Sequence, residues 1–128
     1  MNQHSNESAG IAAGVELFNR GDFWHAHEAW EEIWLAATGE RRRFLQGMIQ
    51  LAAAFHHLQR GTLRGAGRLI AEAEQKTREF PEGYLGLVRK PVVARALDDA
   101  MAIGNGEDPW EDRRPIPSDL PGLAIVPP

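Results

Sequence analysis

An uncharged segment in the middle of the chain is the feature that most constrains its fold. Residues 44–59 contain no Asp, Glu, Lys or Arg, and their apolar residues follow a helical spacing. A helix at a protein surface normally carries charge along one face. An uncharged helix is therefore expected to be surrounded by other elements on most sides. The segment is predicted to be the central helix of an all-α fold.

Glycines and helix-capping residues divide the rest of the chain into separate helices. Asp22 and Thr62 are natural N-caps, and Gly21 and Gly61 follow the ends of the preceding helices. The helices are predicted to span residues 9–18, 22–37, 40–59, 62–80 and 91–103. Connections of about two to four residues make consecutive helices antiparallel neighbours. We therefore expect a small bundle of antiparallel helical hairpins, with about four or five helices and no β-strands.

The two ends of the chain differ from this helical region. Residues 1–8 lack an apolar run, so we expect a flexible N-terminus before a single helical domain at residues 9–104. Residues 105–128 contain six of the eight prolines, and proline cannot continue a helix. This segment is predicted to be an extended, proline-rich tail. The side chains expected to hold it against the bundle are Trp110, Ile116 and Leu120.

Composition excludes several classes of function. The chain has 128 residues, enough for one domain, a formal net charge of −4 and no cysteine. The negative charge weighs against a nucleic-acid partner, and the basic cluster Arg41, Arg42 and Arg43 is expected to lie in solvent at the first turn of a helix. No stretch approaches the ~20 uncharged apolar residues of a membrane-spanning helix, so no membrane partner is predicted. The lack of cysteine and of a secretory signal favours a cytoplasmic location.

The predicted helix at 22–37 places polar side chains beside tryptophans. Its apolar residues form one broad face, which is expected to be core. His27 and Glu31 lie one turn apart at the edge of that face, beside Trp34, while Glu28 lies further round, next to Trp24. An imidazole and a carboxylate four residues apart can hydrogen-bond along the helix or converge on one ligand.

The predicted central helix carries a neutral polar stripe. Gln46, Gln50 and His57 fall on one line along the helix, with the small Ala53 in the gap. Buried amides and imidazoles need partners, because each one left unsatisfied costs ~1–3 kcal/mol. In an antiparallel hairpin the nearest candidates are His27, Glu28 and Glu31, and Gly47 would let the two helices approach closely. The sequence therefore predicts a buried His/Glu/Gln cluster between helices 22–37 and 40–59.

Such a cluster has a structural interpretation and a metal-binding interpretation. As a structural network it would only fix the register of the two helices. As a metal site, His27, Glu31 and His57 would supply the nitrogen and oxygen ligands that zinc, iron or manganese accept. The run His27-Glu28-x-x-Glu31 differs from the zinc motif His-Glu-x-x-His, so the spacing does not select a metal.

Two further interpretations remain open. A small ligand would be lined by the side chains of His27, Glu28, Glu31, Gln46, Gln50, His57, Trp24 and Trp34. Acid–base chemistry could occur there, but no nucleophile or oxyanion donor set is identifiable in the sequence, so enzymatic activity is left undecided. Alternatively, the chain is an interaction module whose helical groove takes a partner. The sequence is compatible with a homo-oligomer and does not decide the oligomeric state.

Two long motifs resemble a known family. Residues 18–34, Phe-Asn-Arg-Gly-Asp-Phe-Trp-His-Ala-His-Glu-Ala-Trp-Glu-Glu-Ile-Trp, are followed by Phe-Leu-Gln-Gly-Met-Ile-Gln-Leu-Ala-Ala-Ala at residues 44–54 and His-Leu-Gln-Arg-Gly at residues 57–61. Together they resemble the domain-of-unknown-function 309 family of bacteria and archaea, over about residues 11–80. The resemblance implies a small all-α fold of helical hairpins, loosely like tetratricopeptide repeats. It implies no established activity, substrate or cofactor.

The resemblance also bears on the predicted site. The signature polar positions of the family correspond to His27, Glu28, Glu31, Gln46, Gln50 and His57. One departure is His25, where the family pattern usually has an acidic residue, so this protein would differ in charge if that position contributes to a site.

Overall fold

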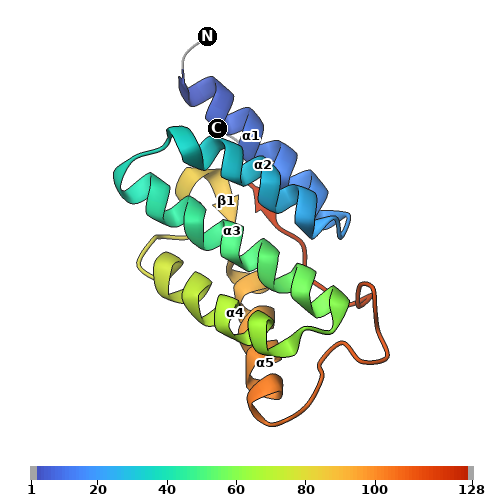
Figure 1. Ribbon diagram of the computed structural model, residues 1–128. Helices are drawn as coiled ribbons and strands as arrows, with labels where there is room; N and C mark the ends of the chain where they lie inside the picture. The colour runs from blue at the N-terminus through green and yellow to red at the C-terminus, as the bar shows by residue number, and fades with distance from the viewer. Residues whose placement is uncertain (1–2, 127–128) are drawn as a thin grey trace.

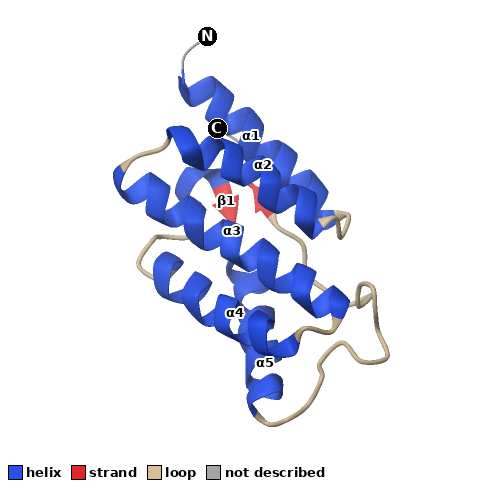
Figure 2. Cartoon of the chain, viewed as in Figure 1, coloured by secondary structure: helices blue, strands red, loops and turns tan. Residues whose placement is uncertain are grey.

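The structure is a computed structural model that describes residues 3–126. Five α-helices make up most of it: α1 (Gln3–Asn19), α2 (Phe23–Ala36), α3 (Gly39–Arg60), α4 (Leu63–Thr77) and α5 (Lys90–Gly104). A short 3₁₀ helix (Tyr84–Gly86) and the strands β1 (Leu87–Val88) and β2 (Ala124–Ile125) complete it (Figures 1 and 2). The predicted all-α bundle is confirmed, with a two-stranded sheet as an addition.

The first four helices run back and forth, each packed against the next along the chain (Figure 1). Positive φ angles at Gly21 (81°) and Gly61 (76°) allow the sharp reversals between them. The central position predicted for the uncharged segment is confirmed, because α3 lies between α2 and α4. Helix α5 packs against α4, and the tail returns along the bundle towards α1 (Figure 1).

Local capping places the start of α2 and the end of α3 where the sequence predicts. Asp22 accepts a hydrogen bond from the backbone N–H of His25 at 3.4 Å. Gly61 ends α3, and its N–H donates to the carbonyl of Leu58 at 3.2 Å. Thr62 stands at the predicted N-cap of α4, but its side chain makes no capping hydrogen bond.

The hydrophobic core is organised around one face of α3. Phe55 lies 5.5 Å from Phe18 and 5.8 Å from Trp110, between ring centroids. Phe23 packs edge-on against Phe18 at 4.8 Å. Because these rings come from α1, α2, α3 and the tail, burying them joins the tail to the first three helices.

Two boundaries differ from the predicted ones by more than one residue. Helix α1 begins at Gln3 rather than at residue 9, and Glu7 within this extension is buried and forms an ion pair with Arg41 of α3. Residues 1 and 2 of the predicted flexible N-terminus lie outside the described part. Helix α4 ends at Thr77 instead of residue 80. Both differences arise from contacts between distant parts of the chain, which apolar periodicity does not report.

The predicted basic cluster also has tertiary partners. Arg41 pairs with Glu7 of α1, and Arg43 pairs with Glu79 at 2.9 Å. The Arg42 guanidinium lies 3.8 Å from the centroid of the Trp34 ring. The cluster lies at the start of α3 as expected, and each arginine also contacts a side chain of another part of the fold.

The tail is folded onto the bundle. Trp110 is fully buried, Leu120 is half-buried and Ile116 is exposed, although it lies directly over Gly21. The Asn19 amide donates to the carbonyl of Leu123 and accepts from its N–H, both at 2.8 Å. Strand β2 then pairs antiparallel with β1, in the register Leu87↔Ile125 and Val88↔Ala124. The predicted absence of strands is wrong at these positions, because two residues per strand are too few to show an alternating pattern.

No helix in the described range 3–126 is both long and apolar enough to cross a membrane.

Candidate functional site

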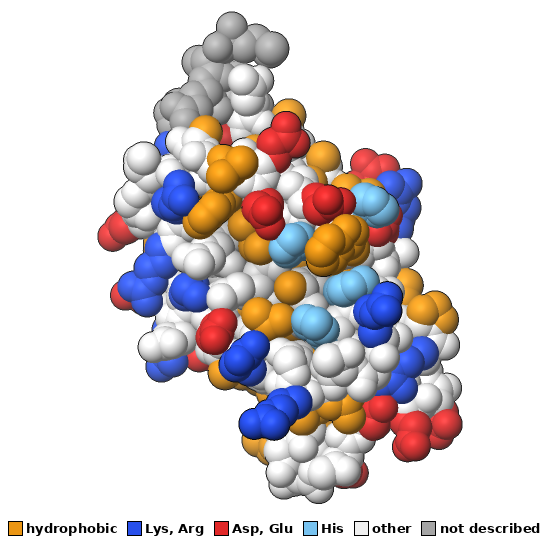
Figure 3. All heavy atoms as spheres, viewed as in Figure 1, with side chains coloured by type: hydrophobic (Ala, Val, Ile, Leu, Met, Phe, Trp, Pro, Cys, Tyr) orange, Lys and Arg blue, Asp and Glu red, His pale blue; other side chains and the backbone are white. Residues whose placement is uncertain are grey.

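The predicted site residues share one face of the molecule, formed by the outer sides of α2, α3 and α4. Figure 3 shows histidines gathered there, with acidic side chains along one side. We call this surface the polar face and define it by the eight predicted residues together with His56. They are Trp24, His27, Glu28, Glu31 and Trp34 from α2, and Gln46, Gln50, His56 and His57 from α3.

The predicted burial of this cluster is wrong. Trp24 is 46% exposed, Glu28 and Glu31 are exposed, and the other members are half-buried. The interior between the helices is filled by apolar side chains of α3 such as Phe44, Met48 and Phe55. The polar stripe of α3 therefore faces outward. A stripe of neutral polar residues looks the same in the sequence whether other helices cover it or solvent contacts it.

His27 and Glu31 form the predicted pair along α2. Their Nε2 and Oε2 atoms are 3.2 Å apart, and the Trp24 ring stacks on the imidazole with centroids 5.0 Å apart. The Nδ1 atom of His27 is buried and has no hydrogen-bond partner within the described chain. Trp24 also contacts the His56 ring at 5.2 Å, so the exposed indole is held by two imidazoles.

Gln50 pairs across to α4 and not to α2. Its Nε2 atom donates to Glu72 at 2.8 Å, and its Oε1 atom accepts from Lys76 at the same distance. Gly47 likewise meets α4: a Cβ atom there would lie 2.5 Å from Cγ2 of Thr77. The predictions that Gln50 serves His27 or Glu31, and that Gly47 brings α2 close, are therefore wrong. At Gln50 and Gly47, α3 contacts α4. A helical wheel that considers only α2 and α3 cannot predict this contact.

His57 also faces α4. A Cβ atom at Gly65 would lie 3.8 Å from its ring, and its buried Nδ1 atom has no partner in the described chain. Burial, followed by the positive charge of Arg60, lowers the pKa of the neighbouring His56. Among the side chains that the structure describes, residues 6–126, no three His, Asp or Glu side chains are grouped closely enough to hold a metal ion, so the set His27, Glu31 and His57 does not fit the zinc, iron or manganese site considered from the sequence.

A small hollow lies in the polar face between α2 and α3. Its volume is about 180 Å³, and it is lined by Glu31, Trp34, Gln46, Ile49 and Gln50. The indole Nε1 of Trp34 is buried without a hydrogen-bond partner in the described chain. Pockets for drug-sized ligands have volumes of about 300–1,000 Å³, so this hollow has room for one side chain or a group of similar size.

Two larger cavities lie elsewhere and were not predicted. One of about 420 Å³ lies between α1 and α2, and its lining combines small residues such as Gly10 and Ala13 with the polar side chains of Glu7 and Glu32. The other, of about 320 Å³, lies between α1, the 3₁₀ helix and the end of the chain at β2, and it is largely apolar. Neither cavity contains a residue of the polar face.

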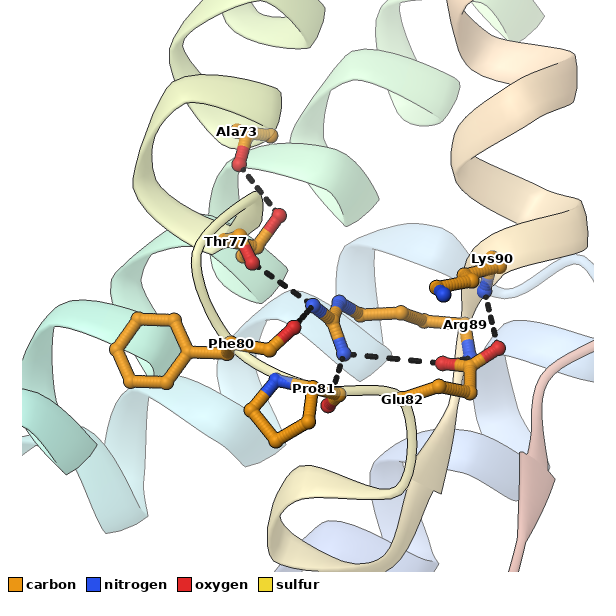
Figure 4. Close-up of polar contacts among 7 residues, drawn as sticks. All are labelled: Ala73, Thr77, Phe80, Pro81, Glu82, Arg89 and Lys90. Atoms are coloured by element: carbon orange, nitrogen blue, oxygen red, sulfur yellow. Dashed lines mark hydrogen bonds and ion pairs between the residues drawn. The ribbon is translucent and has the colours of Figure 1, made fainter.

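A buried polar centre that the sequence did not suggest lies at the end of α4 (Figure 4). Arg89 is 3% exposed and donates to the carbonyls of Thr77 at 2.7 Å, Phe80 at 2.6 Å and Pro81 at 3.1 Å. Burial lowers its pKa, an effect opposed by Glu82, whose carboxylate lies 3.7 Å away. Each of these contacts belongs to the chain itself, so the centre holds the structure together and offers no open position to a ligand.

The Glu82 carboxylate binds the start of α5 from the opposite side of this centre. It accepts hydrogen bonds from the backbone N–H groups of Arg89 and Lys90, both at 2.9 Å. Burial raises the pKa of Glu82, but these two hydrogen bonds and the positive charges of both residues outweigh it and leave the pKa lowered.

By its fold and its polar face, the chain is a small, mostly helical protein with a solvent-facing surface of His, Trp and Glu side chains. Residues 11–69, which contain this whole surface, match the model of the family described as Domain of unknown function (DUF309). The family resemblance seen in the two sequence motifs is thereby confirmed.

Two similar proteins are uncharacterised. An uncharacterised protein of Aquifex aeolicus is 28% identical over 92 residues, which cover 66% of this chain and 28% of that protein. The uncharacterised protein YpuF of Bacillus subtilis is 38% identical over 60 residues, covering 46% of this chain and 34% of YpuF. The matched part thus spans about a third of the length of these relatives.

Proposed function

We propose that this chain is a binding module that takes a segment of a partner protein on the polar face. The observation that carries the proposal is the exposed Trp24 side chain, which shares the polar face with a hollow of about 180 Å³. The nitrogens Nδ1 of His27, Nε1 of Trp34 and Nδ1 of His57 are shielded from solvent and have no partner in the described chain, so a guest could reach them only if these side chains moved.

The exposed Trp24 supports a protein partner. Tryptophan is enriched among the residues that dominate the energy of protein interfaces. This one is 46% exposed and is held between the rings of His27 and His56. An aromatic side chain that is already fixed loses little conformational entropy when a partner covers it.

The hollow beside Trp34 favours a peptide over a metabolite. A volume of about 180 Å³ suits a single side chain, while the rest of a peptide would lie over the open surface that leads to Trp24. This arrangement favours the interaction-module interpretation over the metal and small-molecule interpretations of the cluster.

Selection from a library of random linear peptides displayed on phage tests the proposal. The intact chain is the immobilised target, and enriched peptides are synthesised and titrated by calorimetry. We expect Trp24→Ala to weaken binding at least about tenfold, which corresponds to ~1.4 kcal/mol. Circular dichroism of the variant confirms that it is folded.

Met101→Ala is the matched control, because Met101 is 69% exposed on α5 and lies outside the polar face. It should leave the affinity unchanged. A selection that enriches no peptide, or peptides that bind Trp24→Ala as well as they bind the wild-type chain, would contradict the proposal.

A further inference from the structure

We infer that the partner segment carries a basic side chain, Lys or Arg, which is held by Glu28 and Glu31 and packs against Trp24. The inference rests on the proposed function, because it names the chemistry that the polar face would recognise. The charges of α2, the positions of the nearby cations and the exposed indole of Trp24 support a basic side chain in the partner.

Within the described part of the chain, the ion-pair partners of the two carboxylates are imidazoles. Glu31 lies 3.2 Å from His27, and Glu28 lies 3.9 Å from His25. An imidazole carries a positive charge only when it is protonated, so it is a weaker ion-pair partner for a carboxylate than a guanidinium. The side chains of Glu28 and Glu31 are 54% and 50% exposed, and a partner can therefore reach both.

Many carboxylates elsewhere in the chain are paired with arginine instead. Glu79 lies 2.9 Å from Arg43, Glu74 lies 3.1 Å from Arg78, and Asp108 lies 2.6 Å from Arg114. A guanidinium neutralises a carboxylate at any physiological pH, which an imidazole does not. The α2 side of the polar face therefore keeps a negative charge that these other acidic sites have lost.

The cations closest to the hollow are engaged by other groups. Arg42 covers the Trp34 ring and donates to the carbonyls of Trp34 at 3.3 Å and Ala37 at 3.2 Å. On the α4 side, Lys76 donates to Gln50, which donates in turn to Glu72. Glu72 and Lys76 of α4 are thus linked through Gln50, whereas Glu28 and Glu31 lie along α2.

Trp24 supplies the apolar half of a site for a long cation. It lies one turn before Glu28 on the same helix, so the indole and the carboxylate are neighbours along one face. A lysine or arginine stem packs well on an exposed aromatic ring, and the ring face attracts the charged head. Glu28 and Glu31, three residues apart, would then accept hydrogen bonds from that head. An acidic side chain in this position would be repelled by both carboxylates.

The test uses peptides from the same selection on the intact chain. We expect the Trp24-dependent peptides to be enriched in Lys or Arg at one position. The double variant Glu28→Gln, Glu31→Gln keeps the shape of both side chains, and it should bind the best peptide at least about tenfold more weakly. Affinity for the wild-type chain should fall as NaCl is added, and the double variant should lose most of this salt dependence.

The double variant Glu107→Gln, Glu111→Gln is the control. It removes the same two charges from exposed positions outside the polar face, and its affinity should match that of the wild-type chain. Trp24-dependent peptides without a basic residue, or peptides unaffected by the Glu28 and Glu31 substitutions, would overturn the inference while the proposed function stands. A selection without any Trp24-dependent peptide would overturn both.

Discussion

At the scale of single residues, Arg89 is a buried cation that binds the end of one helix to the start of the next. Its guanidinium satisfies three backbone carbonyls that follow α4, and Glu82 lies beside it (Figure 4). A buried charge is costly unless it is paired and hydrogen-bonded. Here both conditions hold, so removing the side chain would leave several acceptors unsatisfied.

Replacing Arg89 with methionine should therefore lower the free energy of unfolding by about 3 kcal/mol. Urea denaturation monitored by circular dichroism measures the change. Arg78→Met is the matched control, because the Arg78 side chain is 61% exposed and pairs with Glu74 at the surface; it should cost less than about 1 kcal/mol. Equal losses for the two variants would show that Arg89 does not hold the end of α4 in this way.

His56 makes the stability of the protein depend on pH. Its pKa in the folded state is lowered below 6.5, first by burial and then by the charge of Arg60, with His57 and His27 acting in the same direction. The unfolded chain therefore takes up this proton more readily than the folded chain does. Stability is full above the unfolded pKa and falls as the pH drops through 6.5 towards the folded value.

Urea unfolding of the wild-type chain and of His56→Gln, between about pH 7.5 and pH 5.5, checks this prediction. The wild-type chain should lose stability over this range, and the variant should lose less. The pKa of Glu82 is lowered from an ordinary value that already lies below this range, so Glu82 does not mask the effect. Parallel pH profiles for the two proteins would contradict the assignment to His56.

At the scale of the helices, Gly47 sets how closely α3 and α4 approach. A Cβ atom at this position would lie 2.5 Å from Thr77 Cγ2, 3.2 Å from Lys76 Cβ and 3.3 Å from the carbonyl oxygen of Ala73. Real Cβ contacts are not this short, so the two helices would have to separate. The hydrogen bonds from Gln50 to Glu72 and from Lys76 to Gln50 depend on the same approach.

Gly47→Ala should consequently destabilise the protein by about 1–3 kcal/mol, although alanine is the better helix former. The control is Gly104→Ala at the end of α5, where nothing lies within 4 Å of the added atom; it should be neutral or slightly stabilising. Thermal unfolding of both variants measures the difference. A stabilised Gly47→Ala would mean that α3 and α4 can separate without cost.

At the scale of the whole molecule, the proline-rich tail is part of the core. Trp110 stacks on Phe55 and lies 6.3 Å from Phe23, between ring centroids. Its indole N–H donates to Asp99 of α5 at 2.9 Å, and Asp99 also pairs with Arg95 at 3.1 Å. One tail residue thus connects α2, α3 and α5, which makes the bundle dependent on the tail.

Trp110→Ala should destabilise the protein by about 3–5 kcal/mol, because it removes a fully buried ring. Trp110→Phe keeps most of the packing but removes the donor to Asp99, and it should cost about 1–3 kcal/mol. The midpoints of urea unfolding should follow the order wild type, Trp110→Phe, Trp110→Ala. A stability of Trp110→Ala equal to that of the wild-type chain would show that the tail is dispensable.

Helix positions were predictable because their signals are local. Asp22 and Gly61 stop or start helices through hydrogen bonds within a few residues, and α2 and α3 lie within one residue of their predicted bounds. The His27–Glu31 pair was predictable for the same reason, since both residues lie one turn apart on one helix. The two strands and the Arg89 centre were not, because their partners lie further along the chain.

The sequence by itself indicated the five helices, their order and eight of the nine residues of the polar face, His56 being the exception, since periodicity and capping act over one or two turns. Only the tertiary structure decided which way the polar stripe of α3 points. Gly47 lets α4 approach α3, apolar side chains fill the interior, and Gln46, Gln50 and His57 are left on the outer side. A neutral polar stripe is compatible with burial and with exposure, and the packing of neighbouring helices chooses between them.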